Sequence, residues 1–314
     1  MVPRCRRRVN SLDSGRTPLR KAPMRYPHSI RICAGWIATL LCLTACLAAA
    51  PPSAQQKFSA DLYFQGPALE LARAVDRKDG AAIARLIRQE GIDPDLIFDE
   101  NNMPFVAWPV INENLEGLRL LLEAGADPNV RKRYPQRPDK PGANNAMVYA
   151  AGMADPRFLS LLLDHGGDPN TLNSNNEALT YVAWLRNQWP NVQLLIGRGA
   201  NVNYALSSNG SDTVMSWYSS LGNFEQVYWL LQHGGDPTVE IEASPGTPRD
   251  GAMPILEDIY YLPVQERVIP WQRKCQQWLQ DKGIARPPIP DYLRKRRLDF
   301  GLPSEEKDIP LVLP

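Results

Sequence analysis

The chain has few of the residues from which enzymes build active sites and metal centres. Its 314 residues include only three His and five Cys, and no pair of them has the spacing of a zinc site. The sequence also lacks a phosphate-binding loop, a Gly-x-Ser-x-Gly nucleophile elbow and a Cys–His arrangement. His165 and His233 recur at one position of a repeated pattern, which favours a role at helix ends. We therefore expect no catalytic residue, no metal and no cofactor.

Acidic residues outnumber basic ones in the body of the chain. Residues 1–45 carry nine Arg and Lys against one Asp, so the remaining residues have a net charge of about −7 although the whole chain has +1. Attraction to phosphates supplies most of the non-specific affinity of proteins for nucleic acid. A dedicated nucleic-acid binder is therefore not expected.

The apolar stretch 32–45 is too short to span a bilayer comfortably, but it has the length of a signal-peptide core. Basic residues precede it from Met24, so we predict a signal peptide over residues 1–45 that starts at Met24. It ends in Leu43-Thr44-Ala45-Cys46, which resembles the lipobox of bacterial lipoproteins, where the Cys is lipidated and becomes the first residue. An ordinary secretory signal cleaved elsewhere is the alternative. Residues 46–66 are then a tether, with an apolar strap at Leu62, Tyr63 and Phe64.

Cysteines are too few for a disulfide in the mature chain. Cleavage removes Cys5, Cys33 and Cys42, and lipidation uses Cys46, so Cys275 has no intramolecular partner. Packing alone must hold the protein together. The resemblance to lipoproteins implies a lipid-anchored protein in the periplasm, and Leu47 in place of Asp favours the outer membrane.

Two nearly identical segments reveal an internal repeat. "LLLEAGADPN" occupies residues 120–129 and "LLLDHGGDPN" residues 161–170. Glycines that close an apolar helix recur at similar intervals along the chain, at Gly91, Gly125, Gly166, Gly199, Gly234 and Gly283. A period of this length is typical of a solenoid.

Each repeat contains one strongly amphipathic helix. Apolar residues lie seven, four and three positions before the glycine, as in Leu118, Leu121 and Leu122, and this spacing puts them on one helix face. Cys275 falls on such a stripe and is predicted to be buried. Asp-Pro follows most of the glycines and starts a turn, and a second, shorter helix precedes each stripe.

These features resemble the ankyrin repeat. The Gly222-Asn223 turn and "LLLEAGADPN" match its consensus well, whereas the opening Thr-Pro-Leu-His motif is largely absent, as at residues 103–106. The resemblance implies an all-α ankyrin-repeat solenoid over residues 67–285. It would have about six helix-turn-helix units with finger loops between them, and divergent capping units. Residues 286–314 form a Pro-rich and basic extension, which we expect to be solvated and laid along the last repeat.

A solenoid without catalytic residues points to protein binding. Stacked ankyrin units present a concave face of first helices and fingers, where such solenoids hold proteins. We predict contacts from the second finger and from aromatic residues of the first helices, which binding hot spots favour. Trp217 sits at a consensus apolar position and is predicted to pack rather than to contact a partner. The predicted contact residues are Trp108, Arg131, Arg133, Tyr134, Trp184, Trp189 and Tyr218.

The overall layout resembles ankyrin-type immunity lipoproteins that accompany phospholipase-like toxins of type VI secretion systems. That resemblance implies a non-catalytic protein that captures a secreted lipase-like effector, is a monomer when free, and touches the membrane only through its lipid. The alternative is an envelope scaffold or stress-protection protein that holds a resident periplasmic partner. The second finger is basic, and the enlarged fifth finger, about residues 236–254, carries Glu240 and Glu242. Opposite charges on separate fingers would suit one partner with a mixed surface, and two solvated loops are the alternative.

Overall fold

The described part of the chain consists of paired helices joined by long loops. The computed structural model describes residues 58–136, 138, 140–206, 212–241 and 251–313. The first helices of the pairs are α1 (Gly66–Asp76), α3 (Trp108–Ile111), α5 (Ala146–Ala151), α7 (Leu179–Leu185), α9 (Val214–Ser220) and α11 (Pro254–Tyr261). The second helices are α2 (Gly80–Arg88), α4 (Leu115–Glu123), α6 (Pro156–Asp164), α8 (Trp189–Gly197), α10 (Phe224–Gln232) and α12 (Ile269–Asp281), and α13 (Asp291–Asp299) follows them.

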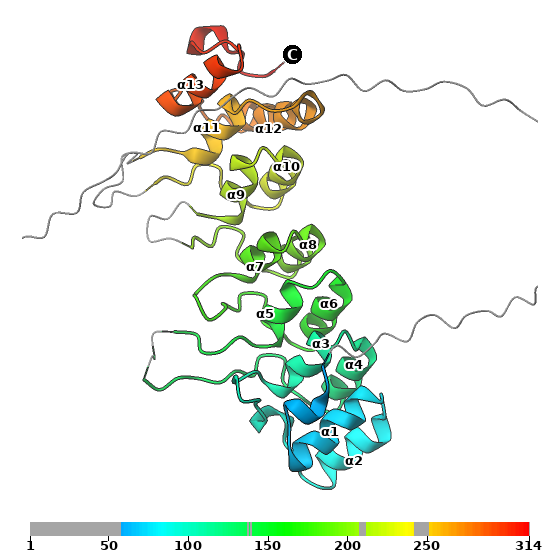
Figure 1. The fold of residues 1–314 in the computed structure, drawn as a ribbon. Coiled ribbons are helices and arrows are strands. Elements are labelled where there is room, and N and C mark those ends of the chain that lie inside the picture. The colour runs from blue at the N-terminus through cyan, green and yellow to red at the C-terminus, as the bar shows by residue number, and fades with distance from the viewer. Residues whose placement is uncertain (1–57, 137, 139, 207–211, 242–250, 314) are drawn as a thin grey trace, which may run out of the picture. The chain divides into compact units, whose positions relative to one another are not determined.

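The helix pairs stack in chain order. Each first helix contacts its own second helix and the first helix of the next pair, from α1 to α11. Figure 1 shows the pairs following one another from α1 and α2 to α11 and α12, with the loops on the side of the first helices. Isolated antiparallel bridges, not extended strands, close two of these loops at Phe98–Pro104 and Leu172–Ala178. The predicted all-α solenoid of about six units is confirmed.

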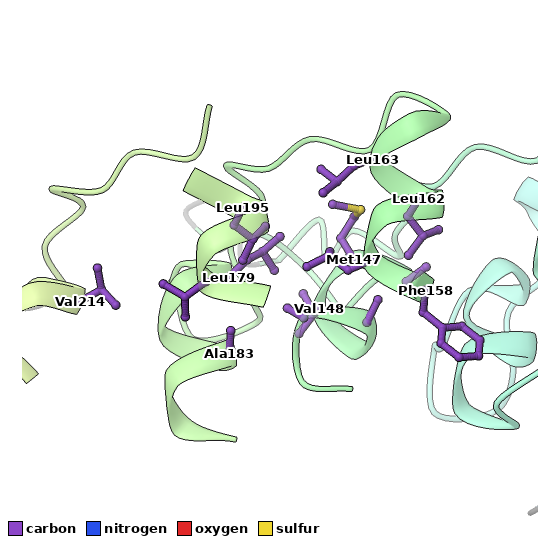
Figure 2. Close-up of a cluster of buried hydrophobic side chains, with 14 of the residues drawn as sticks. Met147, Val148, Phe158, Leu162, Leu163, Leu179, Ala183, Leu195 and Val214 are labelled. Carbon is purple, nitrogen blue, oxygen red and sulfur yellow. The ribbon is translucent and has the colours of Figure 1, made fainter. Parts of the chain in front are cut away.

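The predicted apolar stripes form one continuous core. Leu118, Leu159, Val192 and Val227, which hold the same position in four repeats, are all fully buried. Figure 2 shows the shared core between α5 and α7, where Met147 and Leu179 of successive first helices meet the leucines of α6 and α8. A single pair could not bury its own stripe, so burial depends on the neighbouring pair. The six closing glycines all have a positive φ, which a residue without Cβ adopts at little cost.

An asparagine ladder joins successive fingers; we use this name for Asn129, Asn170 and Asn203. In each case the side-chain amide reaches the turn of the next repeat. Asn129 Nδ2 donates to the carbonyl oxygen of Gly166 at 2.9 Å, and its Oδ1 accepts from the backbone N–H of Asp168 at 2.8 Å. Asn170 makes the same two bonds, to Gly199 and Asn201. The ladder therefore fixes the spacing of the finger turns.

Replacing Asn170 with alanine is expected to lower the free energy of unfolding by about 1–2 kcal/mol, because two inter-repeat hydrogen bonds are lost. Urea denaturation followed by circular dichroism measures this change. Asn175 is a matched control, since its side chain lies on the surface and makes no inter-repeat bond. Equal stability of the Asn170→Ala and Asn175→Ala variants would show that the ladder does not stabilise the stack.

Residues 58–64 belong to the folded domain. Phe64 is buried and packs against Phe105 and Trp108, and the backbone N–H of Phe58 donates to Asn112 Oδ1 at 2.9 Å. The apolar strap predicted at residues 62–64 is present, but Leu62 itself is exposed. The strap contacts the second repeat as well as the first helix. The predicted signal segment and Cys46 both lie outside the described residues.

The C-terminal extension is folded, in contrast to the solvated segment expected from the sequence. Its helix α13 packs against α11 (Figure 1), and Leu293 and Ile309 are buried. Arg297, from the basic run, is also buried, where its guanidinium donates to the carbonyl oxygens of Tyr261 at 3.1 Å and Pro303 at 2.6 Å. The extension therefore caps the last repeat.

Candidate binding surface

Three aromatic side chains form a partly exposed cluster on neighbouring first helices. The ring of Trp217, on α9, lies 4.4 Å from Tyr181 and 5.0 Å from Trp184, both on α7. Tyr181 and Trp184 stack at 5.7 Å with an interplanar angle of 21°. All three side chains remain partly open to solvent. We call this cluster the aromatic platform.

The helical period explains why the platform faces outward. Tyr181 and Trp184 are three residues apart and share one face of α7, whereas Leu179 and Ala183 are fully buried on another face. Figure 2 shows Leu179 and Ala183 inside the core. The core takes up Leu179 and Ala183, whereas the two large rings pack against each other and against Trp217 at its edge.

Exposed apolar side chains extend the platform at the ends of the same helices. Leu185, the last residue of α7, is 58% exposed, and Leu221, which follows α9, is 64% exposed. Contiguous apolar surface of this kind marks interaction sites in soluble proteins. Trp and Tyr are also enriched among the residues that dominate binding energy.

Trp108, predicted as a contact residue, is a core residue. It is 0% exposed, and its indole Nε1 donates to Asp76 Oδ1 at 2.8 Å. Tyr63 and Phe64 of the strap pack against its ring at 5.2 and 5.3 Å. A partner cannot reach this ring in the folded state, so we remove Trp108 from the predicted contact surface.

Tyr218 occupies a packed position, whereas Trp189 is partly open to solvent and stays a predicted contact residue. Tyr218 is 6% exposed, and burial raises the pKa of its hydroxyl. Its ring packs edge-on against Trp189 at 5.2 Å, and Trp189 in turn packs against Trp229 at 5.3 Å. These rings pack between α8 and α10. Trp217, which was predicted to be core, instead lies in the platform.

In the second finger, Arg131 serves the fold. Its guanidinium donates to the carbonyl oxygen of Pro141 at 3.1 Å and to that of Leu172 in the next finger at 2.7 Å, and desolvation lowers the pKa of the group. Arg133 is exposed and Tyr134 is half-buried, so both remain available for contact. In the fifth finger Glu240 is exposed, whereas Glu242 lies outside the described residues.

The described histidines and the described cysteine have roles in the fold. His165 and His233 each place Nδ1 within hydrogen-bond distance of a carbonyl oxygen four residues earlier, at 2.9 and 2.7 Å, so both help to close their helices. Burial raises the pKa of the Cys275 thiol, which disfavours the reactive thiolate. Within the described ranges, no group of three or more His, Cys, Asp or Glu could hold a metal ion.

The same ranges contain no helix with the length and apolar character needed to cross a membrane.

A solved ankyrin structure shows the same fold. The ankyrin repeat domain of Bcl-3, a member of the IkappaB protein family, superposes with a TM-score of 0.50 at 22% identity, over 67% of this chain and 85% of that one. An ankyrin repeat domain from Acinetobacter baumannii AYE gives a TM-score of 0.49 at 22% identity, over 68% and 97%. The chain folds as an ankyrin-repeat domain.

In sequence, the chain is similar to the ankyrin repeat and KH domain-containing protein mask-1 of Caenorhabditis elegans. The two are 24% identical over 191 residues, which is 54% of this chain. The chain spans only 7% of the length of that protein. No family model matches the sequence.

Sequence reasoning missed part of the platform. Tyr181 was not among the predicted contacts, and neither were Leu185 and Leu221. A signal for Tyr181 existed, because it lies three residues before Trp184 and therefore on the same helix face. Its contact with Trp217 joins two repeats and could not be read from either helix alone.

Proposed function

We propose that the protein is a binding module that holds a protein partner through the aromatic platform. The observation that carries the proposal is the cluster of Tyr181, Trp184 and Trp217, three large rings left partly open on adjacent first helices. Solenoids bind proteins through the surface that their stacked repeats share. Rigid aromatic side chains on helices bring large contact area with little loss of conformational freedom on binding.

The finger loops supply the second part of the proposed interface. Arg133 and Tyr134 are accessible on the second finger, and Arg131 ties this finger to the next one through Leu172. A finger held in place by such a bond presents its charges in a fixed geometry. Fixed charges favour specificity and rapid association with a partner of complementary charge.

The finer proposal is an immunity lipoprotein, anchored through Cys46 in the periplasm, that neutralises a secreted lipase-like effector. It is supported by the apolar stretch 32–45 with its lipobox-like end, by the net negative body and by the layout of the repeats. Capture through the platform and fingers would block the active-site cleft of the effector or its approach to the membrane.

Cross-linking in the native host tests both levels of the proposal. The full chain is recovered from cross-linked envelopes, and proteins captured in near-equal amount are identified by mass spectrometry. We expect one dominant partner, with its affinity reduced up to about a thousandfold in a Trp184→Ala/Trp217→Ala double variant, since each hot-spot ring contributes about 2 kcal/mol. For the finer proposal the partner is a secreted lipase-like enzyme.

Trp278→Ala is the matched control, because this half-buried tryptophan lies on α12, away from the platform. A partner that is retained by the platform double variant and lost with Trp278→Ala would contradict the proposed site. Capture of a resident envelope protein in place of an effector would replace immunity with the scaffold function and leave the binding proposal standing.

A further inference from the structure

A groove lies between the last two repeats and the C-terminal extension. Its volume is about 570 Å³, and we call it the C-terminal groove. The turn after α9 and the segment after α11 form one wall, and α13 and the residues after it form the other. Its lining includes Leu221, Asn223, Arg267, Arg296, Phe300 and Leu302.

The walls of the C-terminal groove expose large apolar side chains. Phe300 is 66% exposed, Leu221 64% and Leu302 39%. Leu221 follows α9, whereas Phe300 and Leu302 follow α13, and all three line one hollow. Exposed apolar surface that converges in this way is unfavourable in water unless something covers it.

The charge of the groove has one sign. Arg267 and Arg296 line it together with uncharged residues, and the lining contains no Asp or Glu. Arg267 Nε donates to Gln265 Oε1 at 2.9 Å, and neither arginine forms an ion pair with a described residue. Guanidinium groups pair preferentially with carboxylates, often through two parallel hydrogen bonds. The groove is therefore suited to a ligand that carries an anionic group next to apolar groups.

Asn223 adds a polar group that can recognise a peptide. It precedes α10, where the equivalent residues before α2 and α4, Asp79 and Asn114, accept hydrogen bonds from the helix backbone. The side chain of Asn223 makes no such capping bond. Its amide can therefore donate hydrogen bonds to the main chain of a bound segment and accept them from it. An acyl chain has no polar groups that could form such bonds.

The groove continues the surface of the aromatic platform. Trp217 and Leu221 are four residues apart at the end of α9, so the side chain of one lies beside that of the other. A partner that covers the platform therefore reaches the groove without a break. The end of the described chain does not occupy the groove, since the backbone N–H of Leu313 donates to Gln276 on α12.

We propose that the C-terminal groove binds an extended segment of a protein partner in which apolar residues flank an Asp or Glu, with the carboxylate paired to Arg267 and Arg296. This inference rests on the proposed protein-binding function and adds the chemistry of the segment that is bound. The apolar side chains of the segment cover Leu221 and Phe300. Asn223 bonds to its main chain.

Selection from a phage library of short random peptides tests the proposal with the full folded protein. We expect the wild-type chain to enrich peptides with apolar residues next to Asp or Glu. The affinity of one enriched peptide, labelled with fluorescein, is then measured by fluorescence anisotropy. Arg296→Glu should weaken its binding about tenfold or more, and a peptide with Lys in place of the acidic residue should regain affinity for the Arg296→Glu variant.

Arg273→Glu is the charge-matched control, because Arg273 is exposed on α12 and does not line the groove. Equal weakening by Arg273→Glu, or enriched peptides without acidic residues, would overturn the proposal. Displacement of the peptide by oleate at equal or lower concentration would assign the groove to a fatty acid instead. Binding of the peptides that depends on Trp217 and not on Arg296 would contradict the proposal for the groove. It would leave the proposed binding function of the aromatic platform standing.

Discussion

Replacing Trp108 with alanine is expected to lower the free energy of unfolding by about 4 kcal/mol, because a fully buried indole is removed from a packed core. The side chain is 0% exposed, packs against Tyr63 and Phe64 at 5.2 and 5.3 Å, and donates a hydrogen bond to Asp76. The truncation leaves a cavity and removes the hydrogen bond to Asp76. Denaturant unfolding, followed by tryptophan fluorescence and circular dichroism, measures the loss.

Trp184→Ala is the comparison that makes this result informative. Its ring is partly solvated on the aromatic platform, so we expect a loss of about 1 kcal/mol or less. Hydrogen exchange should show the Trp108→Ala effect concentrated in α1 to α4, because each repeat of a solenoid contacts only its neighbours. Comparable losses for both variants would mean that Trp108 is not the anchor of the N-terminal repeats.

The different burial of Trp108 and Trp217 shows what the repeat pattern could not predict. Both lie at the same distance before their closing glycines, Gly125 and Gly234, so the repeat alone assigns them one environment. In the structure, Tyr63 and Phe64 of the strap pack against the fully buried Trp108, whereas Trp217 packs against the rings of α7 and stays partly open to solvent. Burial of a first-helix residue is thus decided by segments outside the repeat.

The fold itself could be predicted because its signals are local. The apolar stripe before Gly166 and the turn after it depend on residues close together in sequence, and the structure places both as expected. The binding surface depends on distant contacts. Arg131 counts as a surface charge in the sequence, but the carbonyl oxygen of Leu172 in the next finger holds it in place.

The C-terminal extension illustrates the same limit. Proline and a basic run indicate a solvated segment, yet Leu293 and Arg297 lie four residues apart and share one face of α13. That face packs against α11, whose last residue is Tyr261. A helix end leaves carbonyl groups without intrahelical partners, and the Arg297 guanidinium donates to the carbonyl oxygen of Tyr261 at 3.1 Å. One arginine of the run therefore serves as a cap for α11.

Replacing Leu293 with alanine should lower the free energy of unfolding of the last repeat by about 3 kcal/mol, because its side chain is fully buried against α11. Leu298→Ala, on the same helix but 60% exposed, should change it by about 0.5 kcal/mol or less. Hydrogen exchange of α11 and α13, read by mass spectrometry, separates this local effect from global unfolding.

The Leu293→Ala variant also links the extension to the C-terminal groove. Phe300 and Leu302 follow α13 directly, and Arg297 is bonded to the carbonyl oxygen of Pro303, so helix and groove wall are held by the same packing. Loosening α13 should weaken peptide binding to the groove while leaving the rings of the aromatic platform unchanged in near-ultraviolet circular dichroism. If Leu293→Ala and Leu298→Ala unfold alike, the extension is not a cap, and the groove has no fixed second wall.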